Sequence, residues 1–134
     1  MSARILIVED EAVVALELRF VLEDLGHEVI GAAADAAGAR AIAQRGDFDL
    51  ALVDIHLSDG PTGVEVGREL AQSGALVLYI TANPGMLGEG VSGAVGVLTK
   101  PTDERSVQTA VDYVLRRRDG DADLRPPREL RLFG

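Results

Sequence analysis

Cysteine is absent from this chain of 134 residues. Disulfide cross-links are therefore excluded, and so are metal sites that depend on thiolate ligands. The absence of disulfides gives weak support to an intracellular location. A hydrophobic content of 47% is enough to form one apolar core, and the length fits a single domain.

Long apolar runs and concentrated basic charge are also absent. No stretch is apolar for long enough to cross a bilayer, and no charged leader precedes an apolar core as in a signal peptide. With 22 acidic against 13 basic residues the formal net charge is −9. This balance argues against a nucleic-acid surface, because phosphate backbones attract concentrated lysine and arginine. We therefore predict a cytoplasmic protein with no membrane and no nucleic-acid partner.

The few basic residues are unevenly placed. Residues 1–115 carry 18 acidic and 7 basic side chains, whereas residues 116–134 carry 4 acidic side chains and 6 arginines. Two prolines and little periodicity predict a flexible tail over residues 119–134, after a domain of residues 1–118. Lys100 is the single lysine of the chain. It marks a position that favours a compact ammonium group over a guanidinium.

Short apolar runs alternate with helix-like segments, and this alternation predicts the secondary structure. The expected strands are residues 4–8, 28–32, 50–54, 76–80 and 95–98. The expected helices are residues 12–25, 35–46, 62–73 and 103–118. Residues 83–93 contain four glycines and a proline, so a helix there should be short or distorted.

Residues that begin and end helices support these boundaries. Asp35 is placed as an N-cap, and the T-x-x-E spacing of residues 62–65 fits a capping box. Gly26 and Gly74 follow two of the helices as left-handed stops. Glu11 is interpreted as a helix N-terminal acid that the helix dipole stabilises. Five βα repeats in so short a chain predict an α/β fold, a flavodoxin-like three-layer sandwich with a parallel sheet of order 2-1-3-4-5.

Polar side chains follow four of the predicted strands. They are Glu9 and Asp10, Asp54, Thr81 and Lys100. In the predicted strand order the first and third strands are neighbours, so Glu9 and Asp10 should lie beside Asp54. Clustered carboxylates repel one another unless a cation neutralises them, and their hard oxygens suit Mg²⁺ or Mn²⁺. Asp54 is the candidate nucleophile for a phosphoryl group, whose oxygens Lys100 and Thr81 would contact.

Four motifs together resemble the receiver domain of two-component response regulators. They are VEDE after the first strand, LVDIHLSDG, YITA and LTKP, and the resemblance covers about residues 4–118. It implies reversible phosphorylation of Asp54, with phosphate taken from a sensor histidine kinase or a histidine phosphotransfer protein. It also implies a Mg²⁺ site formed by Asp10, Asp54 and the backbone carbonyl of His56, with Glu9 helping directly or through water.

The resemblance assigns roles to further positions. Lys100 would bridge to the phosphoryl group, and Thr81 would move toward it as the switch. The bond between Lys100 and Pro101 would be cis, which a tertiary amide permits at low cost. His56 and Asn83 match the two variable positions that tune the lifetime of the acyl phosphate.

Two positions depart from the receiver pattern. Val97 stands where receivers usually carry an aromatic switch residue, and Thr102 follows the Lys-Pro pair where phenylalanine is common. Receivers commonly use the face of the fourth helix, fifth strand and last helix for partners or dimers. Because of these departures we do not transfer a standard dimer to this chain, and we expect a monomer or a weak dimer.

The leading hypothesis is a stand-alone receiver that signals by binding another protein or by passing phosphate on. It would catalyse only its own phosphorylation and dephosphorylation, so it would not be an enzyme acting on other substrates. One alternative is a pseudo-receiver, an interaction module that works without phosphorylation. Another is a haloacid-dehalogenase-type phosphatase, whose mechanism needs an acid where His56 stands and a cap domain for which the chain has no room.

Overall fold

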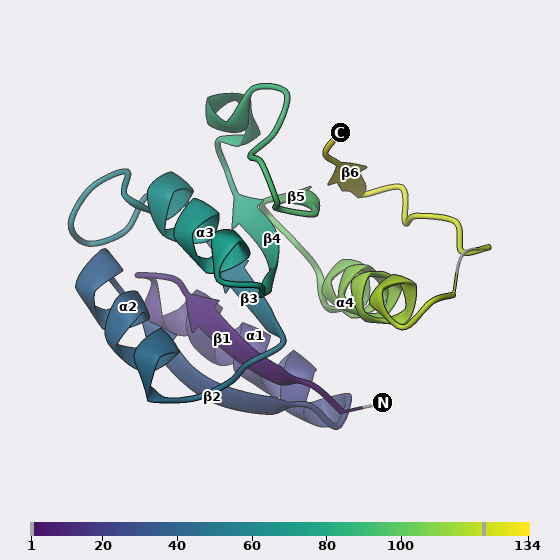
Figure 1. Cartoon of the computed structure of the whole chain (residues 1–134), viewed down its shortest axis with the longest axis horizontal. Coiled ribbons are helices and arrows are strands. Elements are labelled where there is room, and N and C mark those ends of the chain that lie inside the picture. Colours follow the sequence, from purple (N-terminus) through teal and green to yellow (C-terminus); the bar gives the residue numbers. More distant parts are fainter. Residues whose placement is uncertain (1, 122) are drawn as a thin grey trace.

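The protein forms a six-stranded sheet with helices on both faces (Figure 1). The structure is a computed structural model and describes residues 2–121 and 123–134. The strands are β1 (Arg4–Val8), β2 (Glu28–Ala33), β3 (Leu50–Val53), β4 (Leu76–Thr81), β5 (Gly96–Thr99) and β6 (Leu130–Leu132). Their order is β2-β1-β3-β4-β5-β6, and the first five are parallel. The predicted flavodoxin-like order 2-1-3-4-5 is confirmed.

In the part of the chain that the structure describes, four α-helices and one short 3-10 helix connect the strands. They are α1 (Ala12–Asp24), α2 (Ala36–Arg45), α3 (Gly63–Gln72), α4 (Glu104–Arg118) and the 3-10 helix η1 (Pro84–Leu87). The glycine-rich connection between β4 and β5 therefore holds only one short turn, as its composition predicted. Among the described residues, no helix combines the length and the apolar character that crossing a membrane requires.

The strands are apolar because both faces of the sheet are covered. All four residues of β3 are buried. One face packs against α1 and α4, where Leu22 and Leu115 are fully buried. The other face packs against α2 and α3, and it includes Val66 and Tyr79. Figure 1 shows α2 and α3 in front of the strands and α1 behind them, which gives the three predicted layers.

The residues predicted to begin and end the helices are confirmed, but one predicted capping interaction is wrong. The carboxylate of Asp35 accepts a hydrogen bond of 2.7 Å from the backbone N–H of Gly38, as an N-cap should. Gly26 and Gly74 have φ values of 92° and 104°, the left-handed conformation that ends a helix. The capping box at residues 62–65 does not form. The hydroxyl of Thr62 instead donates a hydrogen bond of 2.6 Å to Asp59, and its φ and ψ of −81° and −10° are helical.

The prediction of a flexible tail is wrong for its last part. Residues 130–132 form β6, which pairs antiparallel with β5 and becomes the edge of the sheet. The backbone groups on the free side of β5 gain partners, and Leu130 is buried against α4 and the sheet. Residue 122 of the predicted tail and residue 1 of the predicted domain lie outside the described residues.

Candidate functional site

Three carboxylates meet at the carboxyl end of the sheet, as the strand order predicted. Glu9 and Asp10 follow β1, and Asp54 follows the neighbouring strand β3. Oxygen atoms of the three side chains lie within 4.8 Å of one another. Glu9 is 4% exposed and Asp54 is 8% exposed, whereas Asp10 is open to solvent. The group therefore combines two buried acids with one exposed acid.

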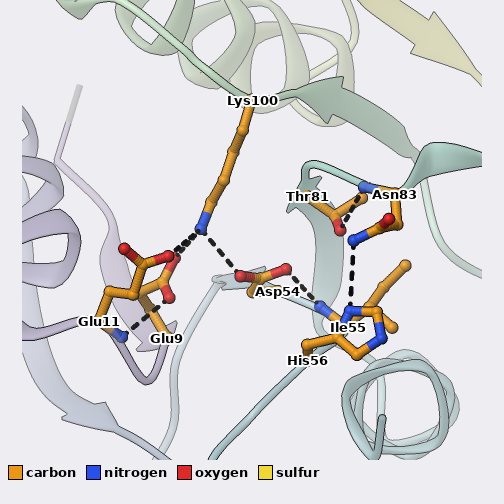
Figure 2. Close-up of polar contacts among 8 residues, drawn as sticks. All are labelled: Glu9, Glu11, Asp54, Ile55, His56, Thr81, Asn83 and Lys100. Atoms are coloured by element: carbon orange, nitrogen blue, oxygen red, sulfur yellow. Dashed lines mark hydrogen bonds and ion pairs between the residues drawn. The ribbon is translucent and has the colours of Figure 1, made fainter.

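Lys100 bridges the two buried acids (Figure 2). Its Nζ donates to Oε1 of Glu9 at 2.6 Å and to Oδ2 of Asp54 at 2.8 Å. A third acid, Glu11, lies 3.7 Å from the same nitrogen. Burial opposes the charge of the ammonium group, but the hydrogen bonds to Asp54 and Glu9 outweigh burial and raise the pKa of Lys100 above its usual value. The single lysine is therefore a fixed positive charge inside the acidic cluster.

The electrostatics of Glu9 differ from those of an exposed glutamate. Burial raises the pKa of Glu9, and the nearby charge of Asp54 acts in the same direction. The hydrogen bonds from Lys100 and from the backbone N–H of Glu11 oppose this rise. A carboxylate that is costly to bury and close to other acids favours a second cation nearby.

The two oxygens of Asp54 have different partners. Oδ2 faces Lys100, and Oδ1 accepts a hydrogen bond of 2.7 Å from the backbone N–H of Ile55. These two contacts fix the plane of the carboxylate at the end of β3. The sequence does not predict the Ile55 contact. Almost any residue after an aspartate has a backbone N–H, so the pattern carries no signal for this hydrogen bond.

Thr81 and the two predicted tuning residues lie on the other side of Asp54 from Glu9 (Figure 2). Thr81 is fully buried, and its hydroxyl oxygen accepts a hydrogen bond of 3.1 Å from the backbone N–H of Asn83. The side-chain nitrogen of Asn83 lies 3.3 Å from Nδ1 of His56, whose side chain is exposed. The two predicted tuning positions are thus in direct contact at the rim of the site.

The remaining predicted positions lie just outside the acidic cluster. The bond between Lys100 and Pro101 is cis, the form that the resemblance implied. Val97 is 1% exposed and pairs with Tyr79 on the neighbouring strand β4. It therefore belongs to the core and has the size of an ordinary packing residue. Glu11 is the N-cap residue of α1, in keeping with its interpretation as a helix N-terminal acid, but its contact with Lys100 was not predicted.

The donor set fits a hard divalent cation. The three clustered acids outnumber the ammonium group of Lys100, which pairs with two of them, and oxygen ligands from carboxylates are those that Mg²⁺ and Mn²⁺ prefer. Asp10 and Asp54 would hold such an ion, with Glu9 beside them. The part expected of the backbone carbonyl of His56 stays a prediction.

Comparison with known proteins identifies the family. The family model of the response regulator receiver domain matches residues 5–112. The phyllosphere-induced regulator PhyR of Methylorubrum extorquens is 34% identical over 119 residues, which cover 86% of this chain and 44% of PhyR. The protein PilH of Pseudomonas aeruginosa is 32% identical over 120 residues, which cover 84% of this chain and 98% of PilH. The chain thus spans about half the length of PhyR and nearly all of PilH.

Solved structures agree with this assignment. The response regulator PhyR from Brucella abortus superposes with a TM-score of 0.80 at 28% identity, over 89% of this chain and 50% of that protein. The anti-anti-sigma factor PhyR from Bartonella quintana has a TM-score of 0.74 at 25% identity, over 92% of this chain and 52% of that protein. The fold, the placement of the acidic cluster and these matches lead to one conclusion: the chain belongs to the family of response regulator receiver domains.

Proposed function

We propose that the chain is a phosphoacceptor and that Asp54 receives the phosphoryl group. The observation that carries this proposal is the placement of the Asp54 carboxylate, which Lys100 and the Ile55 N–H hold from two sides. In the reaction an oxygen of Asp54 forms a bond to phosphorus while the bond between phosphorus and the donor atom breaks. The product is an acyl phosphate, and the donor leaves with the electron pair of the broken bond.

The surrounding residues have the charges that this transfer needs. The ammonium group of Lys100 would face the phosphoryl oxygens, and the hydroxyl of Thr81 would donate to one of them once it turns away from Asn83. Asp10, Asp54 and Glu9 would hold Mg²⁺, which when bound supplies positive charge to the same oxygens. The chain would thereby catalyse only its own phosphorylation by the donor and its own dephosphorylation.

The surface next to the site supports a protein as phosphate donor. Helix α1 begins at Ala12, two residues after Asp10, and three apolar side chains three and four positions apart share one of its faces. Val13, Leu16 and Phe20 are 68%, 50% and 62% exposed. Exposed apolar side chains grouped in this way mark protein contacts. We propose a sensor histidine kinase or a histidine phosphotransfer protein as the donor.

A second protein is the proposed target of the signal. The relative from Bartonella quintana is named an anti-anti-sigma factor. The acidic net charge of −9 also makes a protein a better target than a nucleic acid. We therefore propose that the phosphorylated chain acts by binding a protein or by passing its phosphoryl group on.

Intact mass measurement tests the chemistry. The chain is incubated with acetyl phosphate and Mg²⁺, with and without EDTA, alongside Asp54→Asn and the control Asp59→Asn in the exposed loop after β3. We expect the mass of one phosphoryl group to appear in the wild type and in Asp59→Asn, and to be lost with EDTA and in Asp54→Asn. A folded wild type that gains nothing would contradict the proposal and favour an interaction module that works without phosphorylation.

A further inference from the structure

The edge of β5 is occupied by the chain's own C-terminal segment. Gly96, Val97 and Leu98 pair with Leu132, Arg131 and Leu130, and the N–H of Phe133 donates to the carbonyl of Val95 at 3.0 Å. Figure 1 shows that the segment leaves the end of α4, runs outside the layers and returns to β5. The occupied edge is thus reached by a segment that is distant from β5 in sequence.

Gly96 shapes this edge for a closely approaching strand. A Cβ atom at position 96 would lie 2.3 Å from the carbonyl oxygen of Arg131, which is too close for any real contact. The backbone of Gly96 is outside the left-handed region, so the backbone conformation alone would accept another residue. The glycine therefore matters for the space that it leaves beside β5, and β6 fills that space.

The side chains of the segment alternate between the two faces of the sheet. Leu130 and Leu132 pack with the cluster that contains α4. Phe133 packs with the cluster on the opposite face, where its ring centroid lies 6.3 Å from that of Tyr79. A Cβ atom on Gly90 would come within 2.8 Å of the Phe133 ring, so this loop also leaves space for the aromatic side chain. The edge thus binds an extended Leu-x-Leu-Phe segment in two ways. The backbone of β5 pairs with the segment, and its side chains pack on both faces of the sheet.

The segment that follows α4 has nearly balanced charge. Residues 119–134 carry 4 acidic side chains and 3 arginines, because the other three arginines near the C-terminus belong to α4. The fit of the segment to β5 therefore comes from backbone pairing and apolar contacts, which a second copy offers in the same way. The connection from Arg118 to Leu130 holds the 11 residues 119–129, which can reach at most about 40 Å. That reach is enough to join two adjacent small domains.

We infer that the β5 edge is a docking site for an extended strand, and that its occupant can be exchanged between copies. Residues 130–133 fill the site from within the chain, and the same residues of a second copy make the same backbone and side-chain contacts there. Exchange of an identical element between two copies closes into a symmetric dimer without any new interface. This inference requires neither phosphorylation nor Mg²⁺, so it stands apart from the proposed function.

A peptide experiment tests the docking site directly. The probe is a fluorescent peptide of residues 126–134, and the recipient is the full chain with Leu130→Asp and Leu132→Asp, which cannot fill its own edge. We expect saturable binding by fluorescence anisotropy. Binding to the wild type should be at least about tenfold weaker, because its own strand competes at high effective concentration. A peptide with Leu132→Asp, and a recipient that also carries Gly96→Val, should both abolish binding.

The oligomeric state supplies a second measurement that does not depend on the doubly substituted recipient. Sedimentation velocity of the wild type should show a dimer fraction that rises with concentration, and the Gly96→Val chain should stay monomeric. Circular dichroism establishes that each variant is folded. The inference is overturned if a folded recipient does not bind the peptide, if Gly96→Val leaves binding unchanged, or if the wild type stays monomeric at its highest soluble concentration.

Discussion

The two ends of the sheet are built in different ways. At the β2-β1-β3 end each strand is followed by a regular helix, and α1, α2 and α3 cover both faces. At the β4-β5-β6 end the connection between β4 and β5 contains only the turn η1, and α4 covers one face. Phe133, from the far end of the described chain, packs beside Tyr79 on the other face.

The acidic site lies where these two ends of the sheet meet. Its acids belong to the end where neighbouring segments of sequence pack on one another, whereas Lys100 and Thr81 belong to the end that distant segments complete. Lys100 joins the two ends through its ion pairs with Glu9 and Asp54. A change at the β5 end can therefore reach the acids through this one side chain.

Replacing Lys100 by methionine should have the largest effect on this link between the two ends. We expect phosphorylation by acetyl phosphate to slow by about a hundredfold or more, because a preorganised charge near the transferred group is lost. The measurement is the rate of gain in intact mass. Arg19→Met, which removes an exposed cation from α1, is the matched control. Wild-type rates in Lys100→Met would mean that the β5 end contributes nothing to the chemistry.

A pair of glycine substitutions compares the packing of α3 on the sheet with the packing of η1. A Cβ atom on Gly67 in α3 would lie 2.2 Å from the hydroxyl oxygen of Tyr79, whereas one on Gly85 in η1 would meet nothing within 4 Å. We expect Gly67→Ala to lower the free energy of unfolding by about 1–3 kcal/mol through overpacking. Gly85→Ala should change it by about 0.5 kcal/mol or less. Urea unfolding measures both, and equal losses would show that η1 is packed as tightly as α3.

Helices α4 and α3, one from each end, differ in how they begin. The Asp103 carboxylate accepts a 2.7 Å hydrogen bond from the Ser106 N–H at the start of α4, and the Ser106 hydroxyl oxygen accepts a 3.2 Å bond from the Asp103 N–H. Thr62 makes no such bond at the start of α3. We expect Asp103→Ala to lower Tm by about 4 °C. Thr62→Ala should have the smaller effect, and a larger loss of Tm in Thr62→Ala would argue against this assignment of the caps.

The smallest effect should come from a buried histidine at the α1–β2 corner. Burial lowers the pKa of His27, and Asp112 opposes this shift only in part. Its Nδ1 accepts a 3.0 Å hydrogen bond from the N–H of Ala3. Below its ordinary pKa of 6.5 the unfolded chain binds a proton that the folded chain resists, so stability falls as the pH falls.

This dependence on pH can be isolated by substitution. Chemical unfolding between pH 7 and pH 5 should show that His27→Gln loses less stability on acidification than the wild type. The difference should stay below about 1.4 kcal/mol per pH unit, the limit for one proton. If both proteins respond equally to pH, His27 is not the group responsible. The helix-covered end of the sheet would then have no buried histidine that senses pH.

The sequence predicted the acidic cluster well because strand ends carry positional information. Glu9, Asp10 and Asp54 each follow an apolar run, and the order of parallel strands places those ends side by side. The partners of Lys100 were harder to predict. Its contact with Glu9 spans 91 residues, and nothing in the local sequence of either residue specifies the other.

The errors have physical causes of the same kind. A strand of three residues after two prolines shows no periodicity, and β6 forms because β5 offers a free edge and a gap at Gly96. The T-x-x-E pattern of residues 62–65 occurs by spacing alone, and Asp59 binds the hydroxyl that would have capped α3. Local patterns indicate what a segment favours, and distant partners decide the outcome.

The single lysine has a practical consequence for handling the protein. Lys100 is the only side chain with a primary amine, and its side chain is 14% exposed between two acids. Amine-directed cross-linkers, dyes and surface couplings would therefore react with a lysine only inside the acidic cluster. Any acylation there converts the cation into a neutral amide and leaves Glu9 and Asp54 without it. Immobilisation and labelling are better directed to an introduced cysteine, since the chain has none of its own.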